Sequence, residues 1–274
     1  MVKAQLYNLA NEEFVTLLGR VEEGFEKEGI EHVYVGGVAN QIHVAKALCE
    51  QYNEPLVDLI KSRKVRDQDH LRATDDIDVA LRMQEKGNKR NEIKDRTRIF
   101  SVLDYIVGDE GVFLSPSEDH IVSIEPHRKA HVRPQFRLGI DDKTDNSKIA
   151  SFNFYRSPAD LKDPHLKEFE DRFYDFFIDR GVKVELPYSD KGNLSFKVLN
   201  PADLLAAKIV RGRPKDVSDA MSLVQHFSNA DMSIDCDIVR KTLCSPDERY
   251  GVQSEELMEK YDAFKEMIKV FGKE

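Results

Sequence analysis

The sequence predicts an α+β fold, in which helices flank a mixed sheet and a helical C-terminal part follows. Short apolar runs typical of strands alternate with helical patterns in the first 199 residues. From residue 200 to the end the pattern is helical throughout. A chain of 274 residues is long enough for one large domain or two modest ones. We therefore expect an α/β domain over residues 1–199 and a helical domain over 200–274.

The composition is that of a globular protein. Lys and Arg total 41 against 50 Asp and Glu, which gives a formal net charge of −9, and 41% of the residues are hydrophobic. The acidic balance argues against a surface that coats a long nucleic acid, although a local basic cleft remains compatible with it. No signal-peptide core and no window of about 18 apolar residues is seen. We expect a cytoplasmic protein that makes no membrane contact.

The three cysteines do not suggest zinc or redox chemistry. Cys49, Cys236 and Cys244 are far apart in the sequence and form no C-x-x-C pair. They are interpreted as ordinary reduced thiols.

The first part of the chain predicts a helix, a short strand and a second helix. Apolar residues recur at helical spacing over 11–28, and HVYVGG at 32–37 is typical of a buried strand that ends in paired glycines. A helix is expected from about Val38 to Ile60, with a break near Pro55. The basic stretch 61–70 is expected to be a loop or a frayed helix end.

The middle of the chain mixes helical and strand patterns. Helices are expected over 88–107 and 159–180, and strands over 136–140 and 148–156. Two apolar runs around the turn SDKG predict a hairpin over 181–199.

A helix start is signalled at Asn200. Asn at the N-cap, Pro201 at the first helical position and Asp203 in the first turn form a typical helix N-terminus. The boundary between the two predicted domains is placed here.

An acid pair lies on the predicted strand RATDDIDVAL at 72–81. Asp76 and Asp78 fall on one face, with Cα atoms about 6.5 Å apart, while Ile77 and Val79 fall on the other. Two carboxylates so placed on a rigid strand can share a divalent cation, as metal-assisted phosphoryl chemistry requires. A solvated strand edge is the alternative, because acidic pairs at strand ends are common.

Paired glycines precede the second helix. Gly36 and Gly37 would let the backbone approach a ligand closely, and the helix start behind them would favour an anion. A tight turn that merely needs small residues is the other interpretation.

YVGGVANQIH followed by RATDDIDVAL resembles the nucleotidyltransferase (polymerase-beta-like) superfamily. Its pattern is a strand ending in hG[GS], a helix, and a strand bearing hDh[DE]h. The form R-x-[ST]-x-D-[IL]-D resembles the toxin-type and abortive-infection branch, and so does ADLLAAKIVRGRPKDVSDAMSLV at 202–224. The resemblance implies a nucleotidyltransferase-fold mixed sheet, but it covers only about 60 residues.

The resemblance also implies roles for individual residues. Gly36 and Gly37 would hold the triphosphate of an NTP such as ATP, and Asp76 and Asp78 would bind Mg²⁺, with Mn²⁺ as a substitute. The remaining implied residues are Arg72, Thr74, Arg211 and Arg213 for nucleotide binding, and Lys208 with Asp216, or less favourably Asp219, for catalysis. The Arg211, Arg213 and Lys215 cluster would neutralise phosphate charge.

One position departs from the active members of the family, many of which carry a third carboxylate on a later strand. Alternation in KIASFNFYR puts Asn153 at that position, and an amide cannot accept the proton of an attacking hydroxyl. Glu185 is a weak substitute, and the late acid is another. The basic residues of 61–66 either steer a phosphodiester substrate or form a solvated face.

Other chemistries find little support. His127 and His131 have the i, i+4 spacing of a zinc pair but lack the HExxH glutamate, and no GxxxxGK[ST] loop or GxSxG elbow occurs.

The predicted activity is Mg²⁺-dependent transfer of a nucleoside monophosphate from an NTP to a hydroxyl of an RNA 3′ end, a protein or a small molecule. A non-catalytic nucleotide-binding protein and a metal-dependent nuclease are the alternatives. A toxin role would imply an antitoxin partner.

Overall fold

The computed structural model forms two compact units that are interleaved along the chain. Unit 1 comprises Met1–Tyr34 and Ala73–Asp179, and unit 2 comprises Val35–Arg72 and Arg180–Glu274. The structure describes residues 8–66, 71–72, 74, 77–82, 98, 101–102, 105, 112–114, 123–124, 132–133, 135–140, 148–155, 178–190, 192–243 and 259–266. The sequence predicts a single division after residue 199. In the structure the chain passes from one unit to the other after Tyr34, after Arg72 and after Asp179.

Unit 1 begins with a helix packed on a strand. The helix α1 (Glu12–Lys27) lies against β1 (His32–Tyr34) through the stacked rings of Phe25 and His32, whose centroids are 4.5 Å apart. His32 Nε2 lies 3.0 Å from the Glu22 carboxylate. These contacts explain why the apolar spacing of 11–28 produces a helix with one buried face.

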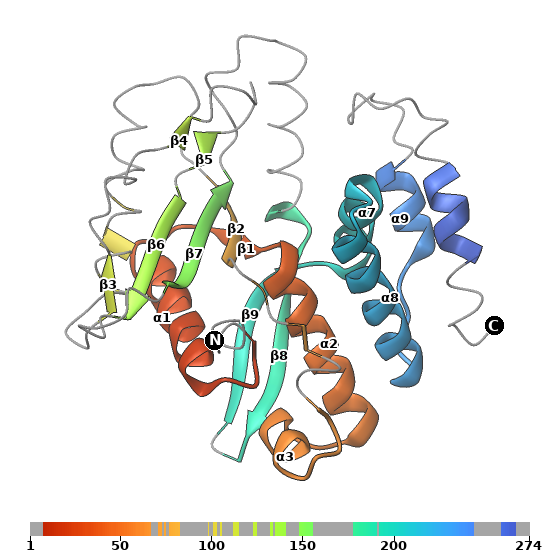
Figure 1. The fold of residues 1–274 in the computed structure, drawn as a ribbon, viewed down its shortest axis with the longest axis horizontal. Helices are drawn as coiled ribbons and strands as arrows, with labels where there is room; N and C mark the ends of the chain where they lie inside the picture. Colours follow the sequence, from red (N-terminus) through yellow and green to blue (C-terminus); the bar gives the residue numbers. More distant parts are fainter. Residues whose placement is uncertain are drawn as a thin grey trace. The chain divides into compact units, whose positions relative to one another are not determined.

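The sheet of unit 1 is mixed. Its strands lie in the order β3, β6, β7, β2, β1, where β2 runs antiparallel to β1 and parallel to β7 (Figure 1). The bounds are β2 Ile77–Leu81, β3 Val112–Leu114, β6 Gln135–Ile140 and β7 Lys148–Tyr155, with a separate pair β4 Ser123–Ile124 and β5 Val132–Arg133. The described chain therefore has the predicted mixed α+β character. The strands expected at 136–140 and 148–156 are confirmed.

Unit 2 places two helices on a β-hairpin. The hairpin consists of β8 (Gly181–Ser189) and β9 (Gly192–Leu199), and α2 (Gly36–Tyr52) and α3 (Leu56–Lys61) both pack against β8. The break between the helices falls at Pro55, which takes the N-cap position of α3. The predicted hairpin and the predicted break near this proline are both confirmed.

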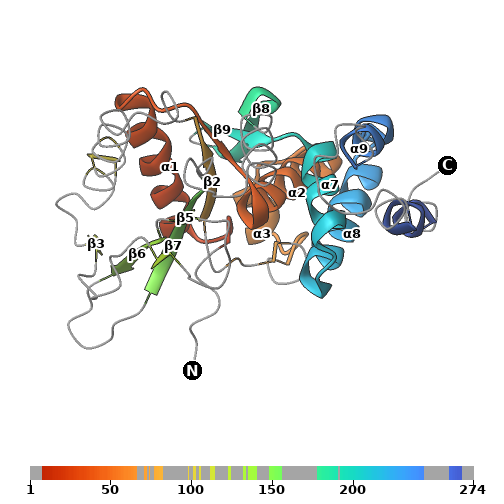
Figure 2. The same ribbon diagram turned by 90° about the horizontal axis from the view of Figure 1, so that it is seen from above.

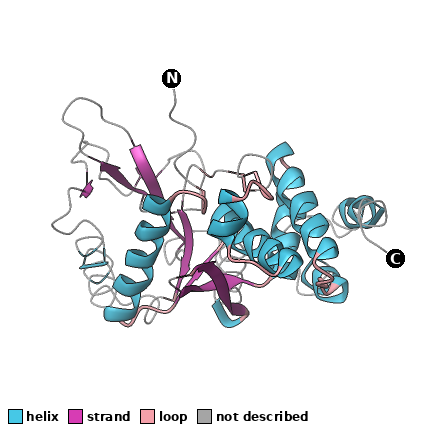
Figure 3. Cartoon of the chain, turned by 90° about the horizontal axis from the view of Figure 1, so that it is seen from below, coloured by secondary structure: helices cyan, strands magenta, loops and turns pink. Residues whose placement is uncertain are grey.

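The described residues of the C-terminal part of unit 2 are mainly helical, as predicted (Figures 2 and 3). It contains α7 (Pro201–Arg211), α8 (Pro214–Asn229) and α9 (Cys236–Leu243), followed by helical residues 259–266. Within it α7 packs on both α8 and α9, and α2 packs on α8.

The start of α7 is fixed by hydrogen bonds. The Asn200 side chain accepts a hydrogen bond from the Asp203 backbone N–H at 2.9 Å and donates to the Arg180 carbonyl at 3.1 Å. The fully buried Asp203 carboxylate pairs with Arg180 at 3.0 Å and accepts from the Thr242 hydroxyl at 2.9 Å. Burial raises the pKa of Asp203, and these partners oppose that shift. The predicted N-cap is confirmed.

One predicted boundary is wrong and several predicted elements cannot be compared. The second helix begins at Gly36 rather than near Val38, so the glycines form its first turn. The expected helices over 88–107 and 159–180 lie almost wholly outside the described residues. Cys244 lies outside them as well. No helix in the described part of the chain has both the length and the apolar character that crossing a bilayer requires.

Replacing Asn200 by alanine removes the cap of α7 and the hydrogen bond to the Arg180 carbonyl. We expect Asn200→Ala to lower the free energy of unfolding by about 1–2 kcal/mol. Urea denaturation checks this, with the exposed Asn193→Ala as the control that should change it by less than about 0.5 kcal/mol. Equal losses in the two variants would contradict the capping role.

The buried His43 makes unit 2 sensitive to acid. Its Nε2 lies 2.7 Å from the Leu199 carbonyl oxygen and its ring meets Phe227 edge-on, and burial lowers the pKa of His43 to about 4. In the unfolded chain His43 therefore becomes protonated near pH 6.5, whereas in the folded chain it stays neutral until the pH is much lower. This contribution to stability is fully present above pH 6.5 and is lost as the pH falls toward 4.

Between pH 7 and pH 5 we expect this histidine alone to remove about 2 kcal/mol from the free energy of unfolding. His43→Gln keeps an N–H donor but no titrating group. The variant should therefore lose about 2 kcal/mol less than the unsubstituted protein over the same pH interval. Urea denaturation at both pH values measures this difference, and identical pH dependence of the two proteins would contradict it.

Candidate functional site

The acid-bearing strand β2 lies in the core of unit 1. Asp78 is only 6% exposed, and its neighbours Ile77 and Val79 are fully buried, so the backbone that carries this carboxylate is held firmly. Thr74, which precedes the strand, is buried as well. Asp76 lies outside the described residues. The structure thus shows one member of the predicted acid pair.

The strand beside β2 carries residue 153, the position at which many members of the resembling family have a third carboxylate. In the parallel pairing of β2 and β7, Asp78 is in register with Asn153. The prediction that residue 153 lies beside the acid strand is therefore confirmed. Glu185, the weak substitute, is exposed on β8 in unit 2, where it pairs with Lys183 at 2.7 Å. That ion pair and a hydrogen bond from Ser195 lower the pKa of Glu185.

The glycine pair opens α2. Gly36 has φ 63°, in the left-handed region that favours glycine, and Gly37 follows it in the first turn. Val35 at the N-cap position provides no side-chain cap, and the first turn contains no acidic residue. Backbone N–H groups at such a helix start suit an anionic ligand.

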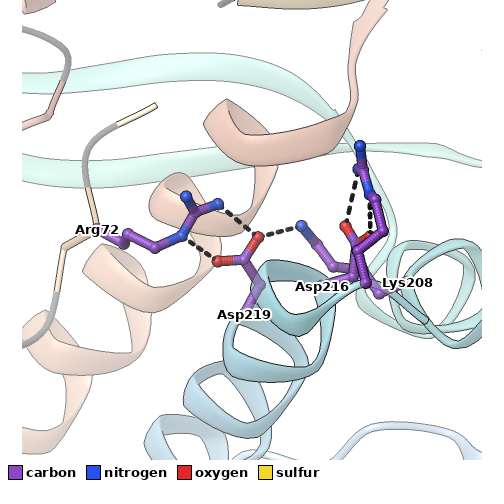
Figure 4. A network of polar contacts seen from close by, with 5 residues as sticks. Arg72, Lys208, Asp216 and Asp219 are labelled. Atoms are coloured by element: carbon purple, nitrogen blue, oxygen red, sulfur yellow. Dashed lines mark hydrogen bonds and ion pairs between the residues drawn. The ribbon is translucent and has the colours of Figure 1, made fainter. Parts of the chain in front are cut away.

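A network of charged side chains joins α7, α8 and Arg72 within unit 2 (Figure 4). The Asp219 carboxylate on α8 accepts two hydrogen bonds from Arg72, from Nε at 2.6 Å and from Nη2 at 2.8 Å. It also accepts a hydrogen bond from the Lys208 ammonium of α7. One carboxylate therefore holds two cations that are far apart in the sequence.

A second pair lies beside this network. The Asp216 carboxylate, also on α8, accepts hydrogen bonds from Arg213 Nε at 2.6 Å and Nη2 at 3.2 Å. The sequence favoured Asp216 as the acid that acts with Lys208, but the hydrogen-bonded partner of Lys208 is Asp219, the second choice. The turn between α7 and α8 causes this, because Gly212 in the left-handed region and Pro214 set which face of α8 meets Lys208.

The network places charges in a poorly hydrated environment. The side chains of Lys208 and Asp219 are 6% and 3% exposed, whereas that of Arg72 is 44% exposed. Burial lowers the pKa of Lys208, and the adjacent Asp219 opposes this shift by favouring the ammonium form. Groups whose pKa is shifted by burial and a specific partner are typical of functional sites, although structural ion pairs share the property.

The other predicted residues are scattered. Lys215 is exposed at the start of α8, and the side chain of Arg211, like His127 and His131, lies outside the described part. Basic residues after α3 are exposed as expected, and among them Lys64 pairs with Glu54. Among described residues, no three His, Cys, Asp or Glu side chains are grouped as metal ligands would be.

Two charge contacts were missed by the sequence reasoning. Arg72 and Asp219 are separated by 147 positions, and no local pattern links them. Arg180 and Asp203 form the second contact, for which the only signal was an acid in the first turn of a predicted helix. Comparison of the chain with protein-family models, with curated proteins and with solved structures gave no match.

Removing the shared carboxylate should destabilise unit 2. Asp219→Ala leaves a buried ammonium and a guanidinium without their counter-ion, so we expect a loss of about 3 kcal/mol in the free energy of unfolding. The double variant Lys208→Met/Asp219→Leu replaces the buried pair by apolar groups and should be more stable than the single variant. Urea denaturation compares the two, and a single variant as stable as the unsubstituted protein would contradict the burial argument.

Proposed function

We propose that the protein is a Mg²⁺-dependent nucleotidyltransferase that moves a nucleoside monophosphate from an NTP to a hydroxyl acceptor. In this reaction the acceptor oxygen bonds to the α-phosphorus, pyrophosphate leaves, and the hydroxyl proton passes to a base. An RNA 3′ end, a protein side chain and a small molecule are the acceptor classes. The proposal takes the described mixed α+β chain to have a nucleotidyltransferase fold.

The contact between Arg72 and Asp219 is the observation that carries the proposal. Arg72 opens the pattern R-x-T-x-D-I-D, and Asp219 belongs to the late pattern with Lys208. One resemblance singled out both patterns, and their charged members, although 147 positions apart, share one carboxylate. A chain whose Lys and Arg side chains merely faced water would not bring them together.

The acid strand and the glycine turn supply further support, each within its own unit. Asp78 is a buried carboxylate on a firmly held strand, and oxygen ligands of this kind suit Mg²⁺. Gly36 begins a helix that has no side-chain cap and no acid in its first turn. Nucleotidyl transfer requires both features to act on the same NTP.

One described carboxylate, that of the buried Asp78, is of the kind that binds a magnesium ion. Asp78, together with Asp76, would hold it, and its charge would stabilise the negative charge that develops on the phosphate in the transition state. Lys208 and Arg72 would neutralise other phosphate oxygens, and Gly36 would donate backbone hydrogen bonds to the triphosphate.

A second candidate is a nucleotide-binding protein that catalyses no transfer. The register of Asn153 beside Asp78 favours it, because an amide cannot take the proton of the acceptor hydroxyl. Transfer without a third carboxylate would need another base, such as an acid of the late pattern.

Calorimetric titration with ATP, CTP, GTP and UTP in the presence of Mg²⁺, combined with transfer of α-labelled nucleotide to bulk RNA and protein, separates the candidates. The transferase predicts binding and label transfer. Binding without label transfer would favour the second candidate, and shortening of RNA without an NTP would indicate a nuclease.

Loss of Asp78 should stop transfer without unfolding the protein. We expect Asp78→Ala to reduce the transfer rate by about 1,000-fold or more, since a metal ligand contributes several kcal/mol of transition-state stabilisation. The melting temperature should stay constant or rise slightly, because the substitution removes a buried carboxylate whose desolvation opposes folding. Asp190→Ala, at an exposed turn, is the control that should retain full activity. An unfolded Asp78→Ala protein would show that this acid is structural.

A further inference from the structure

Basic groups outnumber acidic ones among the five side chains of this network. Asp219 contacts Arg72 and Lys208, and Asp216 contacts Arg213. With all five groups ionised, their formal charges sum to about +1. An excess of basic groups favours the approach of an anion.

The geometry at Arg72 fixes a direction as well as a charge. Its Nε and Nη2 both donate to the Asp219 carboxylate, at 2.6 Å and 2.8 Å, and this bidentate contact determines the plane of the guanidinium. The carboxylate end is buried while 44% of the Arg72 side chain is exposed. Arg72 is thus fixed by a buried carboxylate while part of its side chain stays accessible to solvent.

From this geometry we infer that Asp219 is a positioning residue, which orients Arg72 and Lys208 to bind the phosphate groups of a polyphosphate ligand. The inference rests on the proposed function, because the ligand class includes the triphosphate of an NTP. In this role Asp219 neither touches the phosphate nor accepts a proton. Its carboxylate holds two hydrogen-bond donors in place before the ligand binds.

A merely neutralising carboxylate would behave in the opposite way. If Asp219 only offsets positive charge, then Asp219→Asn removes that offset and must tighten the binding of an anion. If Asp219 positions the two donors, the same substitution releases Arg72 and Lys208 and must weaken binding. The sign of the change in affinity therefore distinguishes the two roles.

Inorganic tripolyphosphate, titrated calorimetrically without metal at fixed ionic strength, is the probe. We expect Asp219→Asn to weaken binding by about tenfold, and Arg72→Lys to do the same because lysine keeps the charge but loses the planar fork. Asp237→Asn is the control: it removes the same formal charge from an exposed position of α9 and leaves both contacts of Asp219 intact. Its affinity should be unchanged or higher.

Arg72→Lys keeps the buried pair of Lys208 and Asp219, so it tests the inference even where Asp219→Asn fails to fold. Thermal melting of each variant establishes which proteins are folded. Tripolyphosphate that binds as tightly to folded Asp219→Asn or to Arg72→Lys as to the unsubstituted protein would overturn the positioning role. Absence of tripolyphosphate binding to the unsubstituted protein would overturn it as well.

The outcome is separable from that of the proposed function. The predicted order of tripolyphosphate affinities, found in a protein that transfers no nucleotide, would support the positioning role and count against the transferase. If the protein transfers label but Asp219→Asn tightens tripolyphosphate binding, the result would support the transferase and count against the positioning role.

Discussion

Two buried aspartates of the C-terminal helices, Asp203 and Asp219, must be neutralised by basic side chains, and much of unit 2 depends on this constraint. Asp203 on α7 pairs with Arg180, which precedes the hairpin, and Asp219 on α8 pairs with Arg72 and Lys208. An isolated charge in these positions would cost several kcal/mol. Each carboxylate therefore ties a helix to a chain segment that is remote in sequence.

The same constraint links stability with the proposed chemistry. Contacts with two cations offset the desolvation of the buried Asp219 carboxylate. The bidentate contact orients one of these cations, Arg72, whose side chain is partly exposed. Burial lowers the pKa of Lys208, and the adjacent Asp219 opposes this shift.

Local rules predicted much of the fold. Periodicity identified α1 and the hairpin, Pro55 identified the break after α2, and Asn200 identified the start of α7. These features depend on neighbours within a few residues, which sequence patterns describe well. Alternation also placed residue 153 correctly, because successive side chains of a strand point to opposite faces and so fix which positions share a face.

Contacts decided by tertiary packing could not be predicted. Lys208 selects Asp219 over Asp216 because the turn at Gly212 orients α8, and nothing in the spacing of the acids reveals that orientation. The helix α2 begins at Gly36, directly after a strand of three residues, and the positive φ of this glycine turns the chain there in a way that the spacing of apolar residues does not reveal.

Nucleotidyl transfer requires one NTP to engage both the glycine turn and the acid strand. Crystals grown with a nonhydrolysable NTP and Mn²⁺ test this directly through the anomalous signal of manganese. The proposed function predicts a manganese peak at the Asp78 carboxylate, with the triphosphate hydrogen-bonded to the backbone of Gly36 and Gly37. A manganese peak remote from Asp78, or a nucleotide that leaves either feature untouched, would contradict it.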